Sequence, residues 1–75
     1  MNGTINNIVS AKMFGFILGE NGQEYFFHRS DVPEIWDEMV MEFERLGRGV
    51  KVTFEPTKTP KGPRAANIVL YGSEY

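Results

Sequence analysis

The sequence contains no cysteine, so neither a disulfide framework nor a thiolate metal site can support the fold. This composition fits a reducing compartment, and we expect a cytoplasmic protein. No apolar stretch approaches the roughly 20 residues that a membrane-spanning helix needs, so no membrane association is expected. A length of 75 residues predicts a single domain over residues 1–75, near the lower size limit for a self-sufficient core.

Basic residues are fewer than acidic ones, eight against ten, and the formal net charge is −2. The acidic residues are unevenly distributed. Six of them and one base lie between Asp31 and Leu46, a local charge of −5, whereas the other residues carry four acids and seven bases, a charge of +3. The acidic total therefore does not exclude a polyanionic partner for the rest of the chain.

Short β-like runs separated by turn residues occupy most of the chain. The predicted strands are residues 4–9, 14–18, 23–29, 50–55 and 65–71. Residues 56–63 contain three prolines and a glycine and are predicted to be a loop. Five strands that return to one small core predict a closed or nearly closed β-barrel.

Between the third and fourth predicted strands, the apolar period changes to that of a helix. Apolar residues recur on one helical face throughout residues 32–46. Asp31 and Glu34 have the spacing of a capping box, and Gly47 is placed to end the helix. We therefore predict an amphipathic helix over residues 31–46 and the element order β-β-β-α-β-β.

The apolar face of this helix has two candidate roles. It can close one end of the barrel and enlarge a small core, or it can bind a partner, either a second copy of the chain or another protein. The residues that suit such an adaptable interface are Trp36, Met39, Met41 and Phe43.

The second and third predicted strands flank Asn21-Gly22 and carry aromatic side chains on both faces. The length of the hairpin loop decides which faces combine. A two-residue loop would place side by side Phe14, Phe16, Tyr25 and Phe27. A three-residue loop with a left-handed Gly22 would instead gather on one face Phe14, Phe16, Phe26 and His28. The residues alone leave both registers open.

Four segments, in order along the chain, resemble the motifs of the cold-shock domain family. KMFGFI and FFH are similar to its two ribonucleoprotein motifs, LGRGVKVTFE to its fourth strand, and PKGPRAANIVL to its last loop and fifth strand. The resemblance covers the chain apart from the helix. It implies a mainly β fold, a five-stranded antiparallel oligonucleotide-binding barrel (OB-fold) with one inserted helix, and it favours the three-residue hairpin loop.

The same resemblance implies sequence-tolerant binding of single-stranded RNA or DNA, and an RNA chaperone role if unpaired strands are trapped. Bases would stack on outward aromatic side chains of the second and third strands, while basic side chains would contact phosphates. Carried over by position and supplemented by a basic neighbour, the expected nucleic-acid-binding residues are Lys12, Phe14, Phe16, Phe26, His28, Arg29, Lys61 and Arg64.

The first strand departs from the family pattern. Asn6, Asn7 and Ile8 stand where the family has Lys-Trp-Phe, so two stacking rings are missing; Met13 replaces a glycine and Arg29 a phenylalanine. At roughly 1–3 kcal/mol per base, two rings would contribute about 2–6 kcal/mol, and we expect weaker binding than a typical member shows. The alternative function is a protein-interaction or self-associating barrel that uses the helix and has little nucleic-acid affinity.

Catalysis has weak support in the sequence. His28, Ser30 and Asp31 are residue types of a hydrolase relay, but residues two apart on a strand do not form one, and there is no nucleophile elbow. The acidic residues from Glu34 to Glu38 favour a solvated helix face over a cation site. We predict that the protein is not an enzyme and uses no cofactor or metal.

Overall fold

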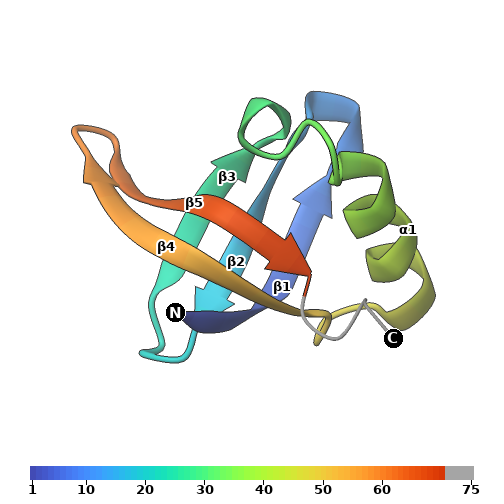
Figure 1. The fold of residues 1–75 in the computed structure, drawn as a ribbon, viewed down its shortest axis with the longest axis horizontal. Helices are drawn as coiled ribbons and strands as arrows, with labels where there is room; N and C mark the ends of the chain where they lie inside the picture. Colours follow the sequence, from blue (N-terminus) through green and yellow to red (C-terminus); the bar gives the residue numbers. More distant parts are fainter. Residues whose placement is uncertain (71–75) are drawn as a thin grey trace.

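A computed structural model describes residues 1–70 and shows a small closed β-barrel with one α-helix (Figure 1). The elements are β1 (Asn2–Val9), β2 (Phe14–Gly19), β3 (Glu24–His28), α1 (Trp36–Leu46), β4 (Lys51–Thr59) and β5 (Gly62–Leu70). The strands are neighbours in the order β1-β2-β3-β5-β4 and are antiparallel except where β3 meets β5. The mainly β OB-fold and the order β-β-β-α-β-β are confirmed.

The register of the β2–β3 hairpin decides which aromatic residues face solvent. Phe14 lies opposite His28, and Phe16 lies opposite Phe26. The connecting loop has three residues, and its last residue, Gly22, has a φ of 83°, a left-handed conformation that glycine adopts without a steric penalty. The structure therefore selects the three-residue loop.

Side chains that alternate with these outward residues fill the barrel. Ile17, Tyr25 and Phe27 of the hairpin are buried together with residues of the other strands, Ile5, Val52, Phe54, Ala65, Ile68 and Leu70. A Cβ atom added to Gly15 would lie 2.7 Å from the carbonyl oxygen of Asn7 and 2.7 Å from the ring of Phe27. This position therefore needs glycine for close packing of β1 and the core ring against β2.

The helix begins later than the sequence predicts, at Trp36. Val32 precedes Pro33, a position at which proline disfavours helical backbone, and it has φ −139° and ψ 50°. The end of the helix is as predicted, because Gly47 has a φ of 70° and its N–H donates to the carbonyl of Phe43 at 2.7 Å.

The predicted capping box between Asp31 and Glu34 is wrong. Asp31 belongs to a 3₁₀ turn, Arg29–Asp31, that directly follows β3. Its carboxylate accepts a hydrogen bond from the backbone N–H of His28 at 2.9 Å, while the His28 imidazole accepts one from the backbone N–H of Ser30. The reciprocal cap thus forms one element earlier than expected.

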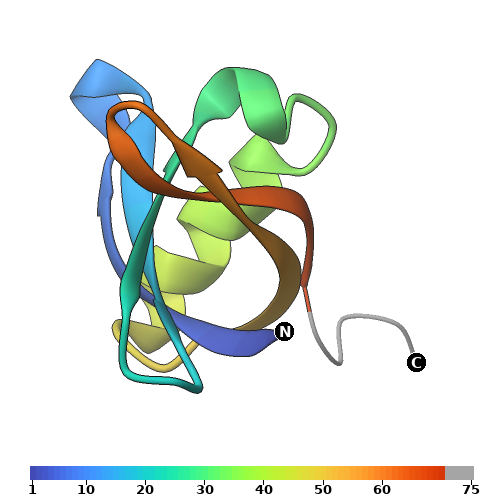
Figure 2. The same cartoon turned by 90° about the vertical axis from the view of Figure 1, so that its left-hand side faces the viewer.

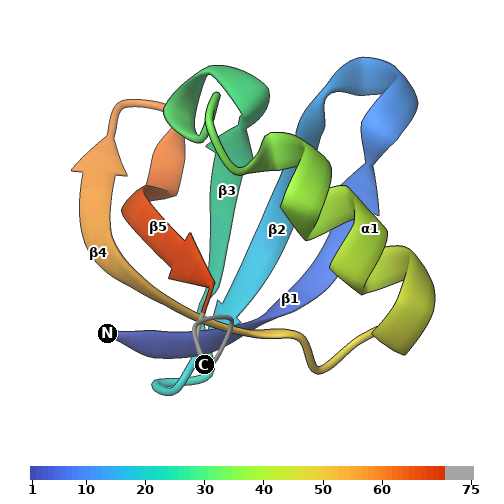
Figure 3. The same ribbon diagram turned by 45° about the vertical axis from the view of Figure 1, so that its right-hand side comes forward.

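Helix α1 covers an opening of the barrel beside β1 (Figures 1 and 3). Trp36 and Met39 are 6% and 0% exposed, and the ring of Trp36 lies 6.2 Å from that of Phe27. Met41, on the outer side, is 68% exposed. The helix therefore contributes to the core. In the described part of the chain, no helix is long and apolar enough to cross a membrane.

Strands β4 and β5 continue through the segment that was predicted to be a loop. They form a hairpin that projects from the side opposite α1 and comes forward in Figure 2. Pro56 lies opposite Ala65, and Pro63 lies opposite Lys58. Because β4 pairs with β1 only at residues 51–53, its later part has an open edge, where proline is tolerated.

The last strand also differs from its predicted bounds. It begins at Gly62 instead of Ala65, because the ladder with β4 reaches the hairpin turn. Its predicted last residue, Tyr71, lies outside the described residues.

Candidate nucleic-acid interface

Three phenylalanine rings form a cluster on the outer side of the β2–β3 hairpin. The ring centroids of Phe14, Phe16 and Phe26 are 5.6–5.9 Å apart, in tilted and edge-to-face arrangements. All three are partly exposed, as is His28 opposite Phe14. We call these four residues the aromatic face. Exposed rings at this spacing offer π-surfaces to planar ligands.

The imidazole of His28 is oriented by the turn that follows β3. Its Nδ1 accepts a hydrogen bond from the backbone N–H of Ser30 at 3.1 Å and lies 3.0 Å from the Ser30 Oγ. A backbone N–H can only donate, so Nδ1 of the neutral ring carries no proton and Nε2 carries it. The ring therefore presents both a flat surface and an N–H donor to a ligand.

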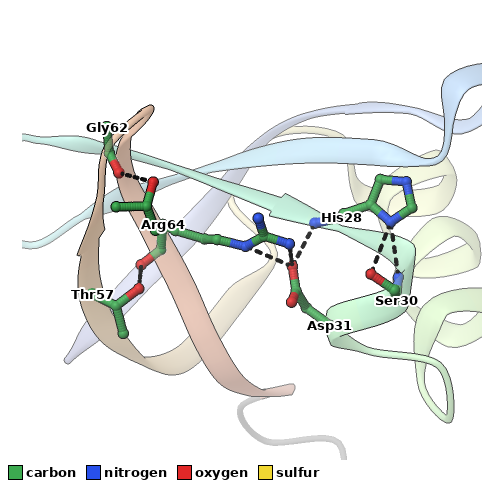
Figure 4. A network of polar contacts seen from close by, with 7 residues as sticks. His28, Ser30, Asp31, Thr57, Gly62 and Arg64 are labelled. Carbon is green, nitrogen blue, oxygen red and sulfur yellow. Dashed lines mark hydrogen bonds and ion pairs between the residues drawn. The ribbon is translucent and has the colours of Figure 1, made fainter.

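The same contacts argue against a hydrolase relay in this turn. Asp31 bonds to the backbone N–H of His28 and not to its imidazole (Figure 4). In a Ser-His-Asp relay the carboxylate must orient the imidazole, and these three residues do not have that arrangement.

Arg64 reaches from β5 to the end of β3 and is held there by Asp31 (Figure 4). Its Nε and Nη2 donate to the Asp31 Oδ2 at 3.2 and 2.9 Å, and its guanidinium carbon lies 5.4 Å from the centroid of the Phe26 ring. Arg64, one of the predicted site residues, thus lies against the aromatic face, and it already has an anionic partner.

The other predicted basic residues, Lys12, Arg29 and Lys61, are exposed and have no acidic partner within residues 1–70. The backbone N–H of Arg29 donates to the carbonyl of Met13 at 2.8 Å, so Arg29 lies beside the turn that carries Lys12. This pair flanks the end of the aromatic face formed by Phe14. Lys61 is in the turn of the β4–β5 hairpin.

This geometry agrees with the comparison to known proteins. Residues 1–71 match the family described as the 'Cold-shock' DNA-binding domain. The chain belongs to the cold-shock domain family. Cold shock protein 1 of Lactiplantibacillus plantarum is 38% identical over 68 residues, which are 91% of this chain and 94% of that protein.

Two further cold-shock relatives match at a similar level. The major cold shock protein of Streptococcus pyogenes serotype M6 is 38% identical over 66 residues, 88% of this chain and 90% of that protein. Cold shock protein CspC of Bacillus subtilis is 35% identical over 66 residues, 88% of this chain and 91% of that protein. The family resemblance of the sequence motifs is confirmed, and nucleic-acid binding is the general role of this family.

Next to the aromatic face, this cold-shock domain has Asn7 and Ile8 where the family pattern has rings, and Asn6 where it has lysine. Asn7 is exposed on β1 and lies opposite Phe16, and the Asn6 side-chain amide donates to the carboxylate of Glu24. The missing rings thus leave a polar surface directly beside Phe16.

Sequence reasoning missed Asp31 as part of this site. The residue is 33 positions from Arg64, and only the short parallel contact between β3 and β5, at Phe26 and Arg64, brings the two together. Helical or strand periodicity carries no signal for such a contact, because it depends on how the barrel closes.

Proposed function

We propose that this cold-shock domain binds single-stranded RNA or DNA, with low sequence specificity, by stacking bases on the aromatic face. The supporting observation is the cluster of three partly exposed rings with centroids no more than 5.9 Å apart. Stacking contributes roughly 1–3 kcal/mol per base and accepts every base, because each has a π-face.

Phosphates would be contacted by the exposed cations Lys12, Arg29 and Lys61. Each phosphate neutralised on a single strand contributes about −0.7 to the slope of log K against log salt concentration, so three contacts predict a slope of about −2. The outer side of helix α1 is expected to repel the nucleic acid, because the helix carries Asp37, Glu38, Glu42 and Glu44.

An RNA chaperone role follows if this binding acts on structured RNA. A ligand that prefers the unpaired state shifts the equilibrium toward that state, and sequence-tolerant stacking suits this task. The function needs no cofactor and no chemical step. The absence of cysteine from the sequence fits a reducing compartment, and we include a cytoplasmic location in the proposal.

The test is fluorescence anisotropy of a labelled six-base oligo-pyrimidine, titrated at several salt concentrations. We expect a dissociation constant in the micromolar range or tighter at low salt. The double variant Phe16→Ala/Phe26→Ala should abolish binding, whereas Met41→Ala, on the exposed side of the helix, should bind like wild type. A folded wild-type protein that shows no binding at low salt would contradict the proposal.

The rival function is an interaction module that binds a second copy or another protein through the helix. Met41 and Leu46 are 68% and 55% exposed, whereas Trp36 and Met39, two of the residues predicted for this interface, are buried in the core. Sedimentation equilibrium separates the two functions. A dimer that Met41→Glu dissociates, combined with unchanged binding of partners by the Phe16→Ala/Phe26→Ala variant, would support the rival.

A further inference from the structure

Arg64 differs from the other predicted basic contacts because its position is set on three sides. Its backbone carbonyl accepts a hydrogen bond from the Thr57 hydroxyl at 3.0 Å, its guanidinium lies over Phe26, and two of its nitrogens donate to Asp31. Figure 4 shows the side chain extended between β5 and the turn after β3. A long surface side chain that is held in this way has lost most of its freedom before a ligand arrives.

The charge of Arg64 is poorly placed to act as a phosphate counterion. The guanidinium and the Asp31 carboxylate form an ion pair at 2.9 Å, with side-chain exposures of 36% and 24%. A phosphate that approached this pair would either meet the carboxylate or have to displace it. Asp31 is not free to move away, because the backbone N–H of His28 also donates to the same carboxylate oxygen.

The shape of Arg64 is well placed for another task. A guanidinium is planar and stacks both on aromatic rings and on nucleobases. Because Arg64 covers part of Phe26, a base cannot use that part of the ring while Arg64 stays in place. The guanidinium itself then forms the surface that the base meets.

We propose that Arg64 acts as a stacking platform for a nucleobase, on top of Phe26, and that Asp31 is the positioning residue that holds it there. The inference rests on the proposed function and deepens it at one position of the interface. In this proposal, Arg64 binds a base through its planar guanidinium group, whereas Lys12, Arg29 and Lys61 bind phosphates through their charge.

Arg64→Lys is the decisive variant, because it keeps the charge and removes the plane. Measured by anisotropy with the same labelled oligo-pyrimidine, Arg64→Lys and Arg64→Ala should both weaken binding by about fivefold or more, with the salt slope unchanged. Lys61→Ala is the matched control and should reduce the magnitude of the slope by about 0.7. Wild-type affinity for Arg64→Lys, or a slope reduced by about 0.7 in Arg64→Ala, would overturn the inference.

Asp31→Asn tests the positioning role, because here the proposal and simple charge attraction predict opposite changes in affinity. The substitution removes a negative charge beside the interface, which by charge attraction alone would tighten binding to a polyanion. We expect weaker binding, because the asparagine oxygen can still accept from His28 but no longer holds Arg64 as an ion pair. Tighter binding by Asp31→Asn would overturn the positioning role.

A third measurement keeps the inference testable if these variants lose stability. All affinities are compared per folded molecule, from urea titrations of each variant, and Arg64→Lys is repeated in a Phe26→Ala background. The cost of Arg64→Lys should shrink there, because the platform has lost its support; equal costs in both backgrounds contradict the inference. If the wild-type protein does not bind the oligonucleotide, the proposed function is wrong. If it binds and Arg64→Lys binds equally well, only this inference is wrong.

Discussion

The β2–β3 hairpin and helix α1 are both rich in large apolar side chains, yet the structure uses them differently. Phe14, Phe16 and Phe26 of the hairpin are partly exposed and contact one another on the surface. Trp36 and Met39 of the helix are almost completely buried. Apolar composition alone therefore does not separate core from surface in this protein; the proposed interaction surface is the apolar area that remains outside after the core has been filled.

The difference has a geometric cause. A strand directs successive side chains to opposite sides, so a hairpin with aromatic residues at consecutive positions must leave some of them outside a closed barrel. The helix has a single apolar stripe, and one packing contact buries it. The charges also differ, since α1 carries four acidic residues and one base, Arg45, whereas the three cations expected to contact phosphates lie on other elements, at Lys12, Arg29 and Lys61.

The largest effect is expected on stability, when a buried side chain of the helix is truncated. Met39→Ala should lower the free energy of unfolding by about 2–5 kcal/mol, because a fully buried side chain is removed and leaves a cavity. Urea denaturation followed by circular dichroism measures the change. Met41→Ala, two residues away and exposed, is the matched control and should change the free energy by less than about 0.5 kcal/mol. Similar small effects for both variants would mean that the helix is not part of the core.

The next largest effect is expected on binding, when Asn7→Trp enlarges the aromatic face. Asn7 is exposed and lies opposite Phe16, so an indole there would extend the stacking surface. The gain expected from one further stacked base is about 1–3 kcal/mol, or about 5- to 150-fold in the dissociation constant. Oligonucleotide anisotropy measures it, and Asn7→Leu controls for added apolar area. Equal gains for both variants would show that general hydrophobic contact, and not stacking, drives binding.

The smallest effect is expected on stability at Met13, the residue that directly precedes Phe14 of the aromatic face. Its φ of 64° is left-handed, which costs a non-glycine residue about 1–2 kcal/mol. Glycine would remove this cost but would lower stability by about 0.4–1 kcal/mol, because it increases the conformational entropy of the unfolded chain. Met13→Gly should therefore raise the free energy of unfolding by about 0.5–1 kcal/mol, with the affinity for oligonucleotide nearly unchanged. Thermal and urea unfolding report the first quantity. A loss of stability would mean that the contact of the Met13 sulfur with Arg29 outweighs the backbone strain.

Local patterns predicted most elements but misplaced several boundaries. The change of apolar period predicted a helix between the third and fourth strands, but Pro33 delays its start to Trp36. Three prolines in residues 56–63 predicted a loop, whereas the open edge of β4 lets Pro56 stay in a strand. The two errors have different causes. Pro33 restricts the backbone of Val32 locally, a signal that the sequence already contained. The tolerance of Pro56 depends on whether its missing N–H faces a neighbouring strand, which is a property of the assembled barrel.

The candidate site divides in the same way. Alternation along β2 placed Phe14 and Phe16 on one side, and alternation along β3 placed Phe26 with His28, from the residues alone. Which sides combine stayed undecided until the register of the hairpin was known. The pairing of Arg64 with Asp31 had no local signal at all.

By itself, then, the sequence determined which residues share a face of each strand and of the helix, because backbone geometry repeats every two residues or every 3.6. Only the tertiary structure decided which faces meet and that the aromatic face stays outside while Trp36 and Met39 of the helix are buried. It also decided that Asp31 holds Arg64 over Phe26. Closure of the barrel makes these choices, since it brings together groups far apart in the chain and leaves room inside for one face of each strand.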